Sequence, residues 1–99
     1  MQQFDMYING NAVQSGNTFD VINPATAKPF AQCQLGGLEH VEQAVAAAKA
    51  AFPAWSRTSD DERKQLLHAV AAAIEANMPE LMQLVTMETG KPMGGLNGV

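Results

Sequence analysis

The chain has 99 residues, of which 46% are hydrophobic and 16% charged, so it is long enough for one domain, too short for two and too apolar to be disordered. Six Lys and Arg against ten Asp and Glu give a net charge of -4, which excludes the basic surface that nucleic-acid binding requires. Because the sequence has neither an apolar run of about 18 residues that could span a bilayer nor a secretory signal pattern, we expect a cytoplasmic protein without a membrane partner.

The first third of the chain has the two-residue alternation that is typical of β-strands. Residues 4–8 alternate apolar and polar side chains and run into Asn9-Gly10, the dipeptide best suited to a tight hairpin turn. Further strands are predicted at residues 11–13, 18–22 and 29–35. The last two are separated by a turn with two prolines, through which we expect them to pair. A small antiparallel sheet is therefore predicted within residues 4–35.

From Leu38 onward the apolar period changes to about 3.6 residues, which predicts helices. Pro53 is expected to stop the first helix. Ser59 stands three residues before Glu62, the spacing of a capping box at the start of the second helix, and Gly90 is a natural left-handed end for the third. The predicted helices cover residues 38–52, 60–76 and 78–89, followed by a glycine-rich tail at 90–99.

The predicted helices have apolar stripes that so small a sheet cannot cover. Alanine side chains bury little area, so the first helix gains stability chiefly by lying against a larger neighbour. We therefore expect uncovered apolar surface, with the remainder of a longer polypeptide or a second copy of the chain as its partner. The stripes are formed by Val41, Ala44, Val45, Ala48, Phe52 and Trp55 on the first helix and by Leu66, Leu67, Val70 and Ile74 on the second.

Other features of the sequence carry no chemistry by themselves. A phosphate-binding loop needs a glycine five positions before Gly-Lys and a Ser or Thr after it, where Val85 and Pro92 stand, so nucleotide binding by the tail is excluded. The single cysteine, Cys33, cannot form an internal disulfide and is expected to be a small buried hydrophobe. His40 and His68 are expected to be solvated helix residues.

The order of the motifs resembles the amino-terminal end of the aldehyde dehydrogenase superfamily, whose members oxidise aldehydes to carboxylic acids with NAD(P). The motifs are "YING", "INPAT", "AVAAAKAAFPAWS", "DERKQLLHAVAAAIEAN" and "METGKP", and the match covers roughly residues 6–92. The resemblance implies an α/β fold class, α+β within this stretch, with a small antiparallel hairpin or sheet followed by two to three helices. Residues 1–99 are then a single segment of the amino-terminal part of a cofactor domain.

The resemblance also implies what the chain does not contain. Members of the family are several times longer, so the tail looks like a linker cut from its continuation, and the motifs of the catalytic cysteine and of the carboxylate base are not in this sequence. Cys33 and Glu88 do not take those roles. NAD or NADP is the cofactor expected of a full-length parent, with none expected for this stretch, which is predicted to be structural and inactive. A non-enzymatic, self-associating interaction module is the alternative.

One minor site is implied by the resemblance. Many relatives hold a structural monovalent cation between backbone carbonyls just before the "NP" turn and the acid of the "ETGKP" segment, which here are Val21, Ile22 and Glu88. Carbonyl and carboxylate oxygens suit a hard cation. The same residues equally suit an ordinary strand and a solvated helix end. Relatives also usually have glycine at the position of Ala27, so a different turn geometry is expected there if a positive backbone angle is needed.

Overall fold

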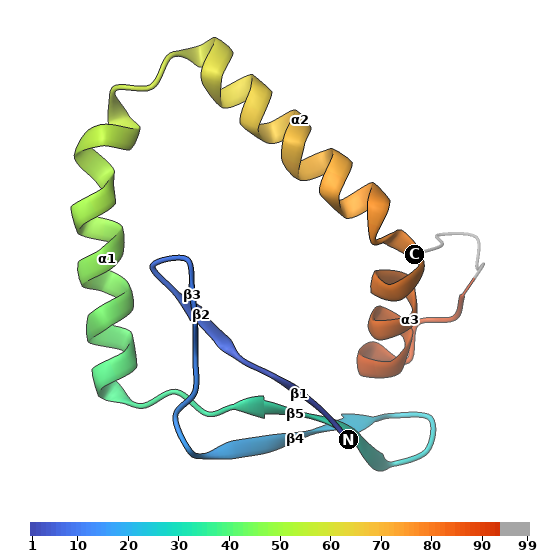
Figure 1. Ribbon diagram of the computed structural model, residues 1–99. Helices are drawn as coiled ribbons and strands as arrows, with labels where there is room; N and C mark the ends of the chain where they lie inside the picture. The colour runs from blue at the N-terminus through green and yellow to red at the C-terminus, as the bar shows by residue number, and fades with distance from the viewer. Residues whose placement is uncertain (94–99) are drawn as a thin grey trace. The chain divides into compact units, whose positions relative to one another are not determined.

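A computed structural model describes residues 1–93 of the chain (Figure 1). Five strands precede three helices, which confirms the mixed α/β fold class predicted from the sequence. The chain forms two compact units, residues 1–22 with 29–57, and residues 23–28 with the chain from Thr58 onward. The elements are β1 (Gln2–Phe4), β2 (Met6–Ile8), β3 (Asn11–Val13), β4 (Thr18–Asn23), β5 (Lys28–Gln34), α1 (Leu38–Ser56), α2 (Asp60–Ala76) and α3 (Met78–Thr89).

The strands form two sheets, and one of them contains a parallel pair. In the three-stranded sheet β5 lies between β1 and β4, and β1 runs parallel to β5 with Phe4 opposite Cys33. The strand predicted at residues 4–8 is divided at Asp5, because Phe4 belongs to β1 whereas β2 pairs with β3. The strands are therefore not all antiparallel. The partner of β1 is distant in the sequence, so no local pattern marks the pairing.

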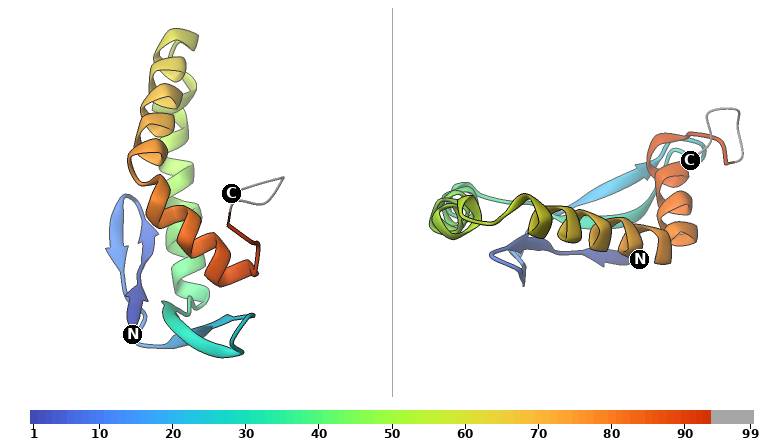
Figure 2. Two further views of the ribbon diagram at one scale, coloured as in Figure 1. Left: turned by 90° about the vertical axis from the view of Figure 1, so that its right-hand side faces the viewer. Right: turned by 90° about the horizontal axis from the view of Figure 1, so that it is seen from above.

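The hairpin of β2 and β3 has the predicted turn. Asn9 and Gly10 have φ angles of 54° and 75°, and positive angles at both central residues define the type I′ turn that matches the twist of the strands. The strands are antiparallel, with Tyr7 opposite Ala12. The hairpin lies beside α1, which β2 contacts (Figure 2).

Very little of the described chain is buried. Ala31, in the central strand β5, is 2% exposed and is the buried hydrophobic residue of residues 1–93. Gln34, near the end of the same strand, is 9% exposed, and its side-chain oxygen accepts hydrogen bonds from the Ser15 backbone N–H at 2.9 Å and from the Ser15 hydroxyl at 3.4 Å. This amide ties the loop after β3 to the sheet.

The start of α1 corrects the role expected for His40. Its side chain is only 12% exposed rather than solvated, and its Nδ1 accepts a hydrogen bond from the Gly37 backbone N–H at 2.9 Å. A nitrogen that accepts this bond has no proton of its own, so its 3.5 Å contact with the Glu39 carboxylate is not an ion pair in this state. His40 therefore satisfies a backbone donor at the helix start, a capping role that the sequence analysis missed.

The predicted end of α1 at residue 52 is also wrong, because the helix continues through Pro53 to Ser56. Proline removes one backbone donor and so weakens one turn. The final turn keeps other bonds: the Ser56 hydroxyl donates to the Pro53 carbonyl at 2.8 Å, and the Arg57 N–H donates to the Ala54 carbonyl at 3.2 Å. A proline this close to the helix end leaves little helix to disrupt.

The second unit contains the capped helix and its successor. The Ser59 hydroxyl accepts from the Glu62 N–H at 3.2 Å while the Glu62 carboxylate accepts from the Ser59 N–H at 3.2 Å, which confirms the predicted capping box. The chain turns sharply at Asn77 between α2 and α3 (Figure 2). Gly90 ends α3 with a φ of 76°, the left-handed angle predicted for it. Of the predicted glycine-rich tail, Gly94, Gly95 and Gly98 lie outside the described residues.

The turn at residues 23–28 also belongs to the second unit. The Asn23 carbonyl accepts from the Thr26 and Ala27 N–H groups at 3.2 and 2.8 Å, and the Asn23 side-chain oxygen accepts from the Ala25 N–H at 2.9 Å. Ala27 has a φ of 58°. The alanine thus adopts the positive angle that glycine would take more readily, so the turn is kept at a cost in backbone strain.

We expect Ala27→Gly to stabilise the chain by about 0.5–1 kcal/mol, because relief of the left-handed strain outweighs the extra chain entropy that glycine has when unfolded. Urea denaturation followed by circular dichroism measures the change. Ala25→Gly is the matched control: Ala25 lies in the same turn without a positive φ, so glycine there is expected to destabilise slightly. Equal effects of the two substitutions would contradict the strain at Ala27.

Candidate functional site

The residues predicted to hold a cation fall in different units. Val21 is half-buried and Ile22 is 46% exposed, both in β4 of the first unit, whereas Glu88 is exposed near the end of α3 in the second unit. Since each unit is described by itself, the cation site stays a prediction. In α3 the Thr86 hydroxyl is buried and has no hydrogen-bond partner among the described residues.

Reactive side chains do not cluster in the described part of the chain. Within residues 1–93 no group of three or more His, Cys, Asp and Glu side chains is arranged to hold a metal ion. Cys33 is a half-buried free thiol in β5, and Glu88 is an exposed helix residue. His68 is exposed on α2, which confirms the helix-surface position expected from the sequence.

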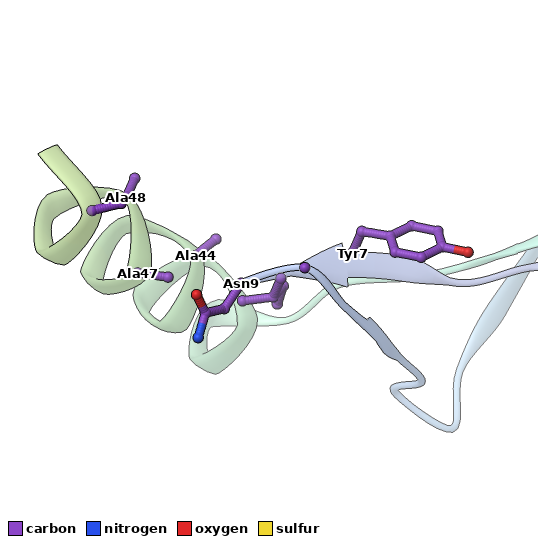
Figure 3. Close-up of a pocket in the computed structure, with 8 residues that line it drawn as sticks. Tyr7, Asn9, Ala44, Ala47 and Ala48 are labelled. Atoms are coloured by element: carbon purple, nitrogen blue, oxygen red, sulfur yellow. The ribbon is translucent and has the colours of Figure 1, made fainter. Parts of the chain in front are cut away.

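A shallow hollow of about 310 Å³ lies in the first unit between the β2–β3 hairpin and α1. In Figure 3 the small alanine side chains of α1 form one wall, Asn9 lies toward the helix, and the Tyr7 ring points away from it. The wall lacks charged groups, so the hollow offers shape and apolar surface rather than chemistry. Its lining residues are Tyr7, Ile8, Asn9, Gly10, Ala44, Ala47, Ala48 and Ala51.

The apolar stripes predicted on the helices are largely exposed. On α1, Leu38 is 73% exposed, Val45 62% and Phe52 65%. The predicted stripe of α2, namely Leu66, Leu67, Val70 and Ile74, is between 47% and 69% exposed. Apolar groups at this spacing are normally buried, so these faces are the most conspicuous candidate surface of the chain. None of the helices in residues 1–93 has the length and apolar character needed to cross a membrane.

The junction between β5 and α1 is the one described place where two adjacent glycines, Gly36 and Gly37, link a strand to a helix, as in many phosphate-binding turns. The Gly37 N–H is already bonded to His40, and a Cβ built on Gly37 would lie 2.8 Å from a Glu39 carboxylate oxygen. A carboxylate at this position repels a phosphate. The described residues therefore do not fit the diphosphate of a dinucleotide.

Comparison with known proteins places these elements in a family. The model of the aldehyde dehydrogenase family matches residues 11–97. The chain is 42% identical over 95 residues to a probable aldehyde dehydrogenase from Pseudomonas sp., which covers 96% of this chain and 20% of that protein. It is 37% identical over 93 residues to the 5-carboxymethyl-2-hydroxymuconate semialdehyde dehydrogenase of Escherichia coli, covering 94% of this chain and 20% of that protein.

A third relative agrees in extent. Acetaldehyde dehydrogenase 2 of Cupriavidus necator is 39% identical over 94 residues, which are 93% of this chain and 19% of that protein. The chain thus spans about a fifth of the length of the curated relatives that it matches.

Proposed function

Because the chain belongs to the aldehyde dehydrogenase family, we propose that it serves as the amino-terminal portion of an oxidoreductase that converts an aldehyde to a carboxylic acid with NAD or NADP. In this role it is structural: its strands and helices brace the cofactor domain, and the reactive groups come from the rest of the enzyme. The cytoplasmic location stays a prediction.

The exposed apolar stripes of α1 and α2 are the observation that carries this proposal. Each buried Leu, Val or Phe side chain contributes about 1.5–3 kcal/mol, so uncovered faces at helical spacing indicate that further polypeptide is meant to pack on them. Within residues 1–93 only Ala31 forms a buried hydrophobic core. The chain also spans about a fifth of its relatives, which supplies a candidate for the covering polypeptide.

The family implies a dinucleotide cofactor, but the residues described here do not hold it. The glycine pair before α1 is blocked by Glu39, so this stretch supplies no group that touches the cofactor or the aldehyde. We accordingly expect no saturable binding of NAD or NADP to the 99-residue chain in titration calorimetry. Clear saturable binding would contradict the structural role.

A split-enzyme experiment tests the positive part of the proposal. The Escherichia coli relative, shortened by the fifth that matches this chain, is assayed for aldehyde-dependent reduction of NAD or NADP alone and after coexpression with this chain. Activity is expected only in the combination. A matched pair of variants reports where the two parts meet: Leu67→Glu, at a site that is 69% exposed on α2, is expected to abolish the rescue, whereas His68→Gln beside it is not. Absence of rescue by the unaltered chain would overturn the proposal.

The exposed stripes also favour a second candidate function, a non-enzymatic module that self-associates through its helix faces. An exposed apolar patch is typical of interfaces whether or not the chain is part of an enzyme. Size-exclusion chromatography of the 99-residue chain distinguishes the two. A stable monomer that binds little hydrophobic dye would contradict the module.

A further inference from the structure

The apolar residues of α1 follow a spacing more regular than a general amphipathic helix. Leu38, Val41, Val45, Ala48 and Phe52 are separated by three, four, three and four residues, the spacing with which two helices interlock side by side. We call these five residues the α1 seam. Its four larger members are 58–73% exposed, and Ala48 is exposed at the border of the hollow next to the hairpin. Trp55, 48% exposed, continues the same spacing.

Two exposed charges flank the seam on one side. Glu42 and Lys49 are seven residues apart, so they occupy the same position relative to the seam one heptad apart, with opposite sign. Neither forms an ion pair within residues 1–93. The corresponding positions on the opposite flank are Ala44 and Ala51, which line the hollow and carry no charge.

These charges specify both the partner and its direction. When two copies of α1 run antiparallel about a point near Val45, Glu42 of each copy lies level with Lys49 of the other, and Leu38 lies level with Phe52 of the other. In a parallel pair the charges of one copy would instead flank Gly37 and Ala44 of the other and stay unpaired. The seam is therefore complementary to itself in one orientation.

We infer that two copies of this chain pair through the α1 seam, antiparallel, with reciprocal Glu42–Lys49 ion pairs at its edge. The inference rests on the second candidate function, self-association, and specifies its interface. The helix has 19 residues and is about 28 Å long, which is sufficient for both ion pairs to form on either side of a central Val45 contact. The alanine face of α1 remains against the hairpin in each copy.

Sedimentation equilibrium of the full 99-residue chain tests the interface. We expect a dimer whose dissociation constant rises roughly a hundredfold on Val45→Glu, because two carboxylates are then brought together at the centre of an apolar seam. Val70→Glu on α2 is the matched control, with the same change at a similar exposure, 55% against 62%, and an expected effect below about twofold. Circular dichroism verifies that both variants keep their helix content.

Charge reversal tests the orientation. Glu42→Lys and Lys49→Glu are each expected to weaken dimerisation roughly tenfold, since each turns two attractive contacts into repulsive ones, and the double variant is expected to recover the original affinity within about threefold. A parallel dimer would ignore the single reversals.

The outcomes separate the inference from the function on which it rests. A monomeric parent chain would overturn both. A dimer that is indifferent to Val45→Glu, or that Val70→Glu disrupts equally, would leave self-association standing but overturn the α1 seam, with α2 or another face as the contact. A dimer broken by Val45→Glu whose charge reversals are not mutually compensating would overturn the antiparallel pairing.

Discussion

Replacing Gln34 by leucine is expected to destabilise the chain by about 1–3 kcal/mol, the cost of leaving a backbone donor without its partner. Gln34 is 9% exposed and its side-chain oxygen accepts from the Ser15 N–H at 2.9 Å. Leucine fills a similar volume but cannot accept, so the loop after β3 loses its attachment to the sheet. Urea denaturation gives the change in free energy, and hydrogen exchange at the Ser15 amide reports the local loss.

Gln14→Leu is the control for this substitution. Gln14 is also a glutamine with a side-chain hydrogen bond, to the Asp5 carboxylate at 3.2 Å, but both the residue and the bond are exposed. Water replaces the lost partner there, so the expected change is within about 0.5 kcal/mol. If the two leucine variants were equally stable, the Gln34 bond to Ser15 would have no structural role.

Gly90→Ala is the second substitution with a large expected effect, a loss of about 2–3 kcal/mol. The φ of 76° is strained for any residue with a Cβ, which alone costs about 1–2 kcal/mol. In addition, a Cβ at Gly90 would lie 3.1 Å from Pro24 Cγ, so the turn at residues 23–28 must shift away from the end of α3. Thermal or urea unfolding followed by circular dichroism measures the sum of the two effects.

Gly10→Ala separates the two contributions. Gly10 has a nearly identical φ of 75°, but a Cβ built there meets nothing within 4 Å. Only the backbone strain is then expected, about 1–2 kcal/mol. The difference between the two variants measures the contact between Gly90 and Pro24, and a difference of zero would show that Pro24 yields without cost.

The features that could be predicted from the sequence depend on neighbouring residues. The Asn9-Gly10 turn, the Ser59–Glu62 capping box and the left-handed Gly90 are each fixed by residue types that favour a backbone angle or supply a hydrogen-bond partner within a few positions. Such signals act within one turn of chain. The structure therefore has them where the residues predicted them.

The features that were missed depend on distant partners or on competing local effects. The pairing of β1 with β5 joins segments that no periodicity connects, and the sequence gives no indication that Asp5 separates two strands. Pro53 was taken as a helix end although its missing donor matters little in a final turn held by Ser56. His40 became a cap because its ring nitrogen reaches the Gly37 amide, which the usual set of short capping residues does not include.

The candidate surfaces were better predicted than the candidate site. Hydrophobic periodicity identified the exposed stripes on α1 and α2, since the same pattern that shapes a helix also identifies the face that seeks a partner. The cation ligands Val21, Ile22 and Glu88 are joined by no local rule, and their assignment rests on the family resemblance. The hollow beside the hairpin had no signal beyond the alanines of α1.

The parallel pairing of β1 and β5 reverses the order of synthesis when the chain folds. β1 is the first strand to leave the ribosome, yet its cross-strand partners are 29 positions further along, as in the bond from Gln3 to Gln32 at 3.1 Å. The β2–β3 hairpin, with its two-residue turn, closes within microseconds, whereas β1 has no strand to join until β5 exists. The oldest residues of the nascent chain are thus among the last to be ordered.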